Sequence, residues 1–413
     1  MNRELLARFT PQRLGEGRTF LIVGGPFGAF TRELGRDLRG AGARCLRVIL
    51  NGGDVYDWGW AHGRVYRGDL HGFSAWVAGL MAAEAVTDIL IYGDTHPYCA
   101  AAAKVATARN VPVHVLEQGY FRPFWITLES EGVNGASRLP RDPRAYLEEA
   151  SGLASPKDEW LAPLTPPAVK NLMIYHFLAM LAAPAFPRFR PAYAYSVPRQ
   201  AIGHLFRYLD QRLFRRRHRR QLAQALDTAG PLFIGVLQRP GDSQLKVHSP
   251  FRNQAEFIEH VVASFARQAP ADARLLFKSH PLDNGLESLG RSVARAAKAH
   301  GAQSRVFFTD VGDLQLMLPP ATGVVTVNST AGLAAMGQGR PTIALGVAIY
   351  DLPGLTHQGG LDSFWTAPEA PDRTLYEAFR RVVIRRCQVS GAFASLEGVR
   401  RAVPGVVERL LSV

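Results

Sequence analysis

Short apolar runs that end in glycine or polar residues recur along this chain of 413 residues, and helical patterns separate them. Phe257, Val261 and Phe265, for example, share one helix face, as do Phe27, Phe30, Leu34 and Leu38. Strands that alternate with helices predict parallel βαβ units. The runs fall into two blocks, so we predict an α/β protein with two doubly wound, Rossmann-like domains. The candidate strands are Thr19–Val23, Cys45–Leu50, Asp88–Tyr92 and Val111–Leu116 in the first block, and Leu232–Leu237, Arg274–Phe277, Arg305–Phe308, Val324–Val327 and Thr342–Leu345 in the second.

The segment between the two blocks has a different pattern. From about residue 142 to 229 it is rich in proline, aromatic residues and arginine and shows little strand signal. We therefore predict a helical insertion or linker. The expected division is 1–145 for the first domain, 146–229 for the insertion, 230–370 for the second domain and 371–413 for C-terminal helices.

The chain carries excess positive charge, with 48 Lys and Arg against 35 Asp and Glu and a formal net charge of +13. This surplus fits nucleic acid, an anionic membrane surface or anionic small molecules as partners, or solubility alone. The densest basic cluster, Arg212 to Arg220, is a membrane-facing cluster or a solvated helix face. No nucleic-acid motif accompanies it, so we expect no nucleic-acid partner.

Signals for export, membrane insertion and metal binding are weak. The N-terminal residues lack the apolar core of a signal peptide, and the longest apolar stretch, 172–186, is shorter than the ~20 residues of a spanning helix. The scattered Cys45, Cys99 and Cys387 form no CxxC pair, which favours a reducing compartment and argues against a metal site. We expect a cytoplasmic protein, soluble or peripheral, without a metal or other cofactor.

Ligands of doubly wound sheets bind beyond the carboxyl ends of the strands. Two such domains that face a cleft would gather the polar residues that follow their strands. These residues are Asn51, Asp54, Asp94, Glu117, Gln238, Asp242, His280, Asp310, Asn328, Ser329 and Thr330.

Each strand-end motif allows a structural and a functional interpretation. The turn 24–26 is a tight strand-to-helix turn or a backbone cradle for phosphate or sugar. Glu117 belongs to a capped turn or acts as a general acid/base. His280, held in extended backbone by Pro281, is structural or lies at the rim of the cleft. The segment 328–330 is an ordinary helix cap or an anion site.

Longer motifs surround these strand ends. They are GPFGAF, NGGD, YGD, EQGYFRPFWITLESEGVNG, LQRPGDSQLKVHSPF, KSHPLDNG, VTVNSTAG and IYDLPGLTHQG. Taken in order, the motifs resemble the bacterial capsular-polysaccharide β-Kdo transferases of the KpsS/LipB type. The resemblance covers nearly the whole chain apart from its Pro-rich and basic middle. The chain differs from the family pattern at Gly24, where the family has Gln, and at Gln118, where many members have a second acid.

The resemblance implies a GT-B fold and a retaining transfer of Kdo from CMP-Kdo. The acceptor would be a lysophosphatidylglycerol-type glycerolipid, or the Kdo linker on it, at the cytoplasmic face of the inner membrane. The first domain would bind the acceptor, the second the CMP-sugar, and the insertion would face the membrane. Other capsule biosynthesis or export proteins are expected partners.

The resemblance also assigns roles to residues of this chain. Asp242 is the expected nucleophile and Glu117 the expected acid/base. The expected donor-binding residues are Gln238, Lys278, His280, Pro281, Asn328, Ser329 and Thr330. The expected acceptor- or sugar-binding residues are Gly25, Pro26, Asn51, Asp94 and Arg122.

Two other functions remain open at this point. A GT-B-fold sugar-nucleotide 2-epimerase would share the Glu-x-Gly turn and a phosphate-binding serine. The sequence lacks an evident uridine-recognition run and contains His-Pro-Leu-Asp, which favours the transferase. A non-catalytic export or scaffold protein would leave the polar residues at so many strand ends without a purpose.

Overall fold

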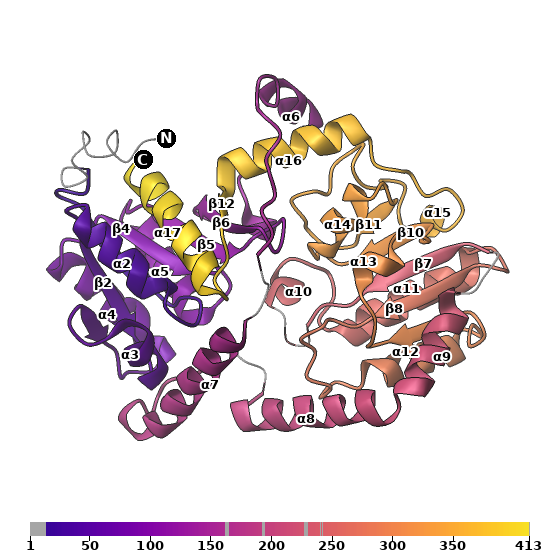
Figure 1. The fold of residues 1–413 in the computed structure, drawn as a ribbon, viewed down its shortest axis with the longest axis horizontal. Coiled ribbons are helices and arrows are strands. Elements are labelled where there is room, and N and C mark those ends of the chain that lie inside the picture. Colours follow the sequence, from indigo (N-terminus) through magenta and orange to yellow (C-terminus); the bar gives the residue numbers. More distant parts are fainter. Residues whose placement is uncertain are drawn as a thin grey trace. The chain divides into compact units, whose positions relative to one another are not determined.

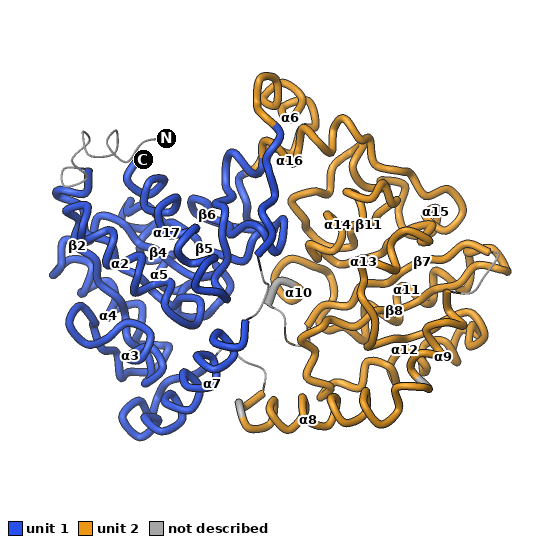
Figure 2. The backbone as a smooth tube through the Cα atoms, viewed as in Figure 1, with its two compact units in different colours: residues 1–138, 155–192, 383–413 blue, residues 139–154, 193–382 orange. Residues whose placement is uncertain are grey.

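The computed structural model describes residues 14–161, 165–191, 195–226, 230–239, 241 and 243–412. The chain divides into two compact units, each assembled from segments that are distant in sequence (Figure 2). Unit 1 comprises 1–138, 155–192 and 383–413, and unit 2 comprises 139–154 and 193–382.

Unit 1 is built on a sheet of seven strands in the described part of the chain, in the order β12-β6-β5-β4-β1-β2-β3. The pairs among β1 to β5 are parallel, whereas β6 is antiparallel to both of its neighbours. The strands are β1 (Thr19–Val23), β2 (Arg44–Ile49), β3 (Gly63–Val65), β4 (Asp88–Tyr92), β5 (Val113–Gln118), β6 (Trp125–Ser130) and β12 (Gln388–Ser390).

Helices cover both faces of the unit 1 sheet (Figure 1). They are α2 (Phe30–Gly40), α3 (Gly52–Trp58), α4 (Leu70–Ala83), α5 (Pro97–Thr107), α7 (Pro166–Leu181) and α17 (Leu396–Leu411). Phe20 and Ile22 of β1 pack with α2 and α17, whereas Leu21 and Val23 pack with α4 and α5. Because both faces are buried, the successive residues Phe20 to Val23 of β1 are all apolar, which explains why such strands are continuous apolar runs.

Unit 2 contains a five-stranded, fully parallel sheet in its described residues, in the order β11-β10-β7-β8-β9. The strands are β7 (Leu232–Val236), β8 (Arg274–Lys278), β9 (Val306–Thr309), β10 (Gly323–Thr326) and β11 (Thr342–Ala344). The helices are α6 (Pro143–Glu149), α8 (Val197–Leu213), α9 (Arg215–Leu226), α10 (Ser243–Val247), α11 (Gln254–Gln268), α12 (Leu289–Ala299), α13 (Leu314–Met317), α14 (Ala331–Gly337), α15 (Leu361–Phe364) and most of α16 (Arg373–Cys387). Phe233 packs toward α11 and α12, whereas Ile234 packs toward α9, α13 and α14.

The predicted fold class is confirmed, because each predicted strand exists with its bounds shifted by at most two residues. β3, β6 and β12 escaped prediction because β3 and β12 are only three residues long and β6 alternates with polar residues. The predicted helix face was wrong at one position. Phe27 precedes α2 and is 36% exposed, and its ring contacts the ring of Tyr175 at 4.7 Å.

The structure distributes the predicted helical insertion over both units. α7 packs in unit 1, whereas α8 and α9 pack in unit 2. Two glycines allow the close contact between α7 and α3: a Cβ on Gly53 would lie 2.6 Å from the Tyr175 ring, and one on Gly52 would lie 2.5 Å from the Leu178 carbonyl oxygen. The C-terminal residues also join the units, since α16 leads from unit 2 into unit 1 and α17 packs on α2.

None of the helices in the described residues has both the length and the apolar character of a membrane-crossing segment.

Candidate functional site

The switch point of the unit 1 sheet lies between β1 and β4, because the chain proceeds from β1 to β2 and β3 on one side and then returns to β4 and β5 on the other. Ligands of doubly wound sheets bind at such a point. Gly24 and Gly25 follow β1 there, and Gly93 follows β4, all with positive φ. A Cβ on Gly24 would lie 3.0 Å from the Cys99 sulfur, and one on Gly25 2.6 Å from the Thr31 methyl. A side chain at either position would be strained by the positive φ and crowded by these neighbours.

Two predicted acidic residues border this switch point. A Cβ on Gly93 would lie 3.1 Å from Oε2 of Glu117, so the Glu117 carboxylate lies against the turn after β4. Its Oε1 accepts the backbone N–H of Gln118 at 2.8 Å. Asp94 accepts from the backbone N–H of Val133 through Oδ2 at 3.1 Å, whereas its buried Oδ1 has no partner. Both residues are partly exposed, and the structure thus brings Gly25, Asp94 and Glu117 to the same sheet edge.

The other predicted residues of unit 1 are Arg122, Pro26 and Asn51, and two of them make local hydrogen bonds. Arg122 is exposed, and its Nε donates to the Gly119 carbonyl at 3.0 Å. Pro26 lies in the loop before α2 instead of at the start of the helix. Asn51 is buried, and its Oδ1 accepts the N–H groups of Gly53 and Asp54 and so caps α3. This capping gives Asn51 a structural role; its assignment to sugar binding stays a prediction.

A buried polar cluster surrounds Asn51. Arg47 of β2 pairs with Asp54 at 3.0 Å, and the two side chains are 1% and 5% exposed. Arg47 also donates to Thr31 Oγ1 at 2.7 Å. The Tyr175 hydroxyl donates to Asp54 at 3.0 Å and accepts from the Asn51 amide at 3.1 Å. Burial, followed by the nearby Asp54 charge, raises the pKa of Tyr175 well above its ordinary value, which keeps the hydroxyl a hydrogen-bond donor.

Asp57 is a buried acid that sequence reasoning missed. It lies on α3 and accepts the Gly28 N–H through Oδ2 at 3.1 Å, whereas its buried Oδ1 has no partner. Burial raises the pKa of Asp57 to about 7, against the opposing effect of the Arg47 charge. Burial likewise lowers the pKa of His96, whose buried Nδ1 has no partner. The one sequence signal for this acid was the i, i+3 spacing of Asp54 and Asp57, which places both on one side of α3. This spacing does not reveal which of the two carboxylates pairs with an arginine.

The switch point of unit 2 lies between β7 and β10, because β8 and β9 extend to one side of β7 and β11 lies beyond β10. Gln238 follows β7 and Asn328 follows β10, and the Gln238 amide donates to Asn328 Oδ1 at 2.8 Å. Gln238 is 6% exposed, and its Oε1 has no partner. The structure therefore joins two predicted donor-binding residues at the place where a ligand of this sheet is expected.

Ser329 and Thr330 lead from β10 into α14. Ser329 Oγ accepts the Ala331 N–H at 3.2 Å, and the Ser329 carbonyl accepts the Tyr350 hydroxyl at 2.6 Å. Thr330 occupies the N-cap position without a side-chain capping bond. Both residues are partly exposed. The ordinary cap is thus absent at Thr330, which leaves the anion-site interpretation open.

Lys278 is the last residue of β8, the neighbour of β7, and His280 lies two residues beyond it. Lys278 is 4% exposed, and its Nζ donates to the Ser279 carbonyl at 2.8 Å. Burial, together with the nearby Arg207 charge, lowers the pKa of Lys278 to about 8. His280 is partly exposed, and its Nδ1 accepts the Leu282 N–H at 3.0 Å. This bond fixes the imidazole orientation next to Pro281.

The expected nucleophile, Asp242, lies outside the described residues. Its neighbour Arg239 is described and donates to the Gln200 side chain at 3.1 Å.

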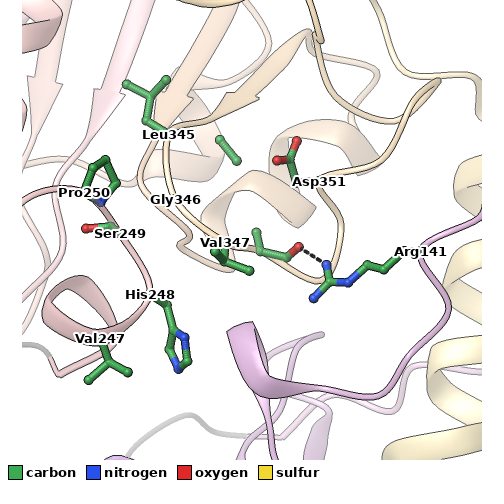
Figure 3. Close-up of a pocket in the computed structure, with 11 residues that line it drawn as sticks. Arg141, Val247, His248, Ser249, Pro250, Leu345, Gly346, Val347 and Asp351 are labelled. Carbon is green, nitrogen blue, oxygen red and sulfur yellow. Dashed lines mark hydrogen bonds between the residues drawn. The ribbon is translucent and has the colours of Figure 1, made fainter.

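A cavity of about 560 Å³ opens beside the unit 2 switch point, within the size range of small-molecule sites (Figure 3). Arg141 lies at one side of it and donates to the Ala348 carbonyl at 2.8 Å. His248 lies at another side, and its buried Nε2 has no partner. The His248 carbonyl accepts the Val347 N–H at 2.8 Å and the Asn328 amide at 3.5 Å. The cavity is thus linked to a predicted donor-binding residue. Sequence reasoning missed Arg141 and His248, which follow no strand.

Metal ligands are not clustered in the described residues, which contain no group of three or more His, Cys, Asp or Glu side chains that could hold a metal ion.

Two doubly wound α/β units in one chain, each with polar residues at its switch point, are the architecture of the GT-B class. Residues 87–394 match the family described as capsule polysaccharide biosynthesis protein. The chain is 31% identical over 378 residues to the capsule polysaccharide export protein KpsS of Escherichia coli, which covers 91% of this chain and 97% of KpsS. It is 32% identical over 410 residues to the capsule polysaccharide modification protein LipB of Neisseria meningitidis serogroup B, which covers 96% of each. The chain therefore belongs to the capsule polysaccharide biosynthesis protein family, as its motifs predicted.

Solved structures with related folds include the β-Kdo 2,7 transferase of Thermosulfurimonas dismutans KpsC, with a TM-score of 0.46 and 13% identity over 96% of this chain and 99% of that chain. The UDP-GlcNAc 2-epimerase of Neisseria meningitidis matches with a TM-score of 0.29 and 10% identity over 96% of this chain and 100% of that chain. Similarity at these levels does not distinguish one activity from another.

Proposed function

We propose that this chain is a retaining β-Kdo transferase that uses CMP-Kdo. The acceptor is a lysophosphatidylglycerol-type glycerolipid or the Kdo linker on it, in capsular polysaccharide biosynthesis. The observation that carries the proposal is the hydrogen bond between Gln238 and Asn328 at the unit 2 switch point, with the cavity beside it. Membership of the capsule polysaccharide biosynthesis family supports the same class of reaction.

The donor binds to unit 2 in this proposal. Ser329, Thr330 and His280 bind the CMP phosphate, and Lys278 supplies a nearby positive charge. The 560 Å³ cavity accepts the nucleoside, where Arg141 and the unpartnered His248 Nε2 offer polar contacts.

His280→Ala tests the phosphate assignment. Losing a hydrogen bond to a charged phosphate costs about 1.5–3 kcal/mol, so CMP affinity measured by calorimetry should fall roughly tenfold or more. His260→Ala is the matched control, because His260 is exposed on α11 and follows no strand. Unchanged affinity for the His280 variant would contradict the assignment.

Retention follows from two displacements. The Asp242 carboxylate attacks the anomeric carbon of Kdo, and the bond to the phosphate oxygen breaks so that CMP leaves with the electron pair. The acceptor hydroxyl then attacks the same carbon, Asp242 leaves as carboxylate, and Glu117 takes the hydroxyl proton. The position of Glu117 supports this role, because its carboxylate lies against the turn after β4, at the sheet edge where a ligand of unit 1 is expected.

Intact-protein mass spectrometry tests these steps. Glu117→Gln with CMP-Kdo, generated in situ, should accumulate one covalently bound Kdo, and the double variant with Asp242→Asn should not. Asp242→Asn alone should bind CMP normally and lose nearly all transfer to a lysophosphatidylglycerol analogue. An adduct on another residue, or free epimerised UDP-sugar formed from UDP-GlcNAc, would refute the assignment.

The transferase acts on a lipid acceptor, so we propose peripheral association with the anionic inner membrane. The basic cluster Arg212 to Arg220 and the apolar stretch 172–186 were the predicted contacts. In the structure only part of this stretch could contact a membrane. Tyr175 and Phe186 are buried, whereas Met173 and Phe177 are 68% and 57% exposed.

A further inference from the structure

Helix α8 faces the body of unit 2 with its polar side. Gly203 is buried, and Gln200, Arg207 and Gln211 are partly buried, which marks one side of the helix at a spacing of three or four residues. A Cβ on Gly203 would lie 2.3 Å from the Asn284 carbonyl oxygen. Gln211 donates to the carbonyl and the carboxylate of Asp310 at 3.3 and 3.0 Å. The inward side of α8 therefore makes hydrogen bonds to backbone and acid, and it also meets the Leu286 side chain at Gly203.

The outward side of α8 is apolar. A helix on the surface of a protein normally buries such a side against the core, but here it is exposed over several turns. Large contiguous apolar patches on a protein surface mark interaction sites. The residues and their exposed fractions are Ile202 at 53%, Leu205 at 55%, Phe206 at 67%, Leu209 at 39% and Leu213 at 73%.

Positive charge follows the apolar residues of α8 along the chain. α8 leads directly into α9 along one edge of unit 2 (Figure 1). The exposed arginines at this junction are Arg212, Arg215, Arg216, Arg219 and Arg220. In general, apolar and aromatic residues next to arginines favour binding to an anionic lipid interface.

The inward side of α8 holds the loop that follows β8. Arg207 is 10% exposed and lies 3.5 Å from the Asp310 carboxylate. Its guanidinium binds several oxygens of the loop that contains the predicted phosphate contact. The acceptors in this loop are the carbonyl oxygens of His280, Pro281 and Asp283 and the hydroxyl of Ser279. The carbonyl oxygen of Asp310, which follows β9, accepts from the same guanidinium.

We propose that α8 docks on an anionic lipid surface and that this docking raises the affinity of unit 2 for CMP through Arg207. The affinity part rests on the donor site proposed above. Segments with few buried apolar contacts open readily, and α8 is attached to unit 2 by polar contacts. A lipid surface that fixes α8 also fixes the loop at His280. By linkage, CMP must strengthen lipid binding by the same factor.

Vesicle flotation of the full chain tests the docking surface. The wild type should float with phosphatidylglycerol vesicles, less so in high salt, and not with phosphatidylcholine vesicles. Leu205→Ser with Phe206→Ser should abolish flotation. The matched control replaces Leu316 and Leu396 by serine, which are 77% and 59% exposed but lie outside α8. Equal flotation of the two double variants would overturn the proposal, as would a dimer in light scattering that only the α8 variant abolishes.

Calorimetry with CMP tests the coupling. Phosphatidylglycerol vesicles should raise CMP affinity at least about fivefold in the wild type. The vesicles should raise CMP affinity equally in the control variant, but not in the α8 double variant. Without vesicles, the CMP affinity of the α8 double variant should match that of the wild type. Arg207→Gln should float with the vesicles normally, but the vesicles should no longer raise its CMP affinity. A misfolded variant would not lose the second property and keep the first. Equal affinity with and without vesicles in the wild type would refute the coupling. Absence of any CMP binding would refute the donor site, while flotation would still decide the docking surface.

Discussion

Replacing Asp54 by Asn should destabilise unit 1 through the buried charge of Arg47. The two side chains are 1% and 5% exposed and lie 3.0 Å apart. Asn keeps the shape and an oxygen for the Leu50 N–H, which Asp54 accepts at 2.9 Å. It removes the negative charge, and breaking a buried ion pair in this way costs about 3–5 kcal/mol. Thr31 still accepts from Arg47, so we expect a loss of about 3 kcal/mol.

Asp57→Asn is the matched control and should act in the opposite direction at high pH. The folded pKa of Asp57 is about 7, above its ordinary value of 3.8. The folded chain therefore binds more protons than the unfolded chain between these values, and stability falls as the pH rises from about 4 to about 7. Asn removes this loss and can still accept from Gly28. Relative to the wild type, the variant should gain about 2–3 kcal/mol when the pH is raised from 5 to 8.

Urea unfolding at pH 5 and pH 8 measures both effects, and hydrogen exchange of the β1 and β2 amides assigns the transition to unit 1. The reasoning is refuted if Asp54→Asn stays within about 1 kcal/mol of the wild type, well below the cost of an unpaired buried charge. It is also refuted if Asp57→Asn is no more favourable at pH 8 than at pH 5.

Two further variants test the donor site and the packing of α7. Since the pKa of Lys278 is about 8, the CMP affinity of the wild type should fall as the pH rises through 8. Lys278→Met should bind CMP weakly at pH 7, and its affinity should not change between pH 6.5 and 9. If calorimetry gives the wild type and the variant the same pH dependence of CMP affinity, the Lys278 charge does not meet the phosphate. Gly53→Ala places a Cβ 2.6 Å from the Tyr175 ring and should lower stability in urea unfolding by about 1–3 kcal/mol. Gly79→Ala on α4 is the control, because an added Cβ there would have no neighbouring atom within 4 Å, and it should be neutral or stabilising. Equal losses of stability in the Gly53 and Gly79 variants would show that the contact with Tyr175 is not the cause.

The parallel strands other than the three-residue β3 were predictable because both faces of each sheet are buried. A strand such as Leu232–Val236, buried at every position, is visible as an unbroken apolar run. The antiparallel β6 was not visible, because Trp125–Ser130 has exposed and buried positions and lies near the sheet edge. The polar residues at the strand ends were also visible in the sequence, whereas the switch points depend on the strand order, which comes from the structure.

Roles at the strand ends were only partly predictable. Asn51 and Asp94 both follow strands, yet the first caps α3 and the second has an unpartnered Oδ1. Sequence places a residue at an edge, whereas its hydrogen-bond partners come from other segments, such as Tyr175 on α7 for Asn51. Asp57 was missed for the same reason, since its burial depends on how α3 packs.

The direction of α8 was the least predictable feature, and it has the largest consequence. A period of three or four residues predicts that a helix has an apolar side, but tertiary partners decide which side faces inward. At α8 the neighbouring surface consists of carbonyl oxygens and the Asp310 carboxylate. A guanidinium has five donors for such a surface and a leucine side chain has none, so Arg207 turns inward and Leu205 and Leu209 turn outward. A helix held in this way leaves its apolar side without a partner in its own unit. The same inward arginine ties it to the loop of His280.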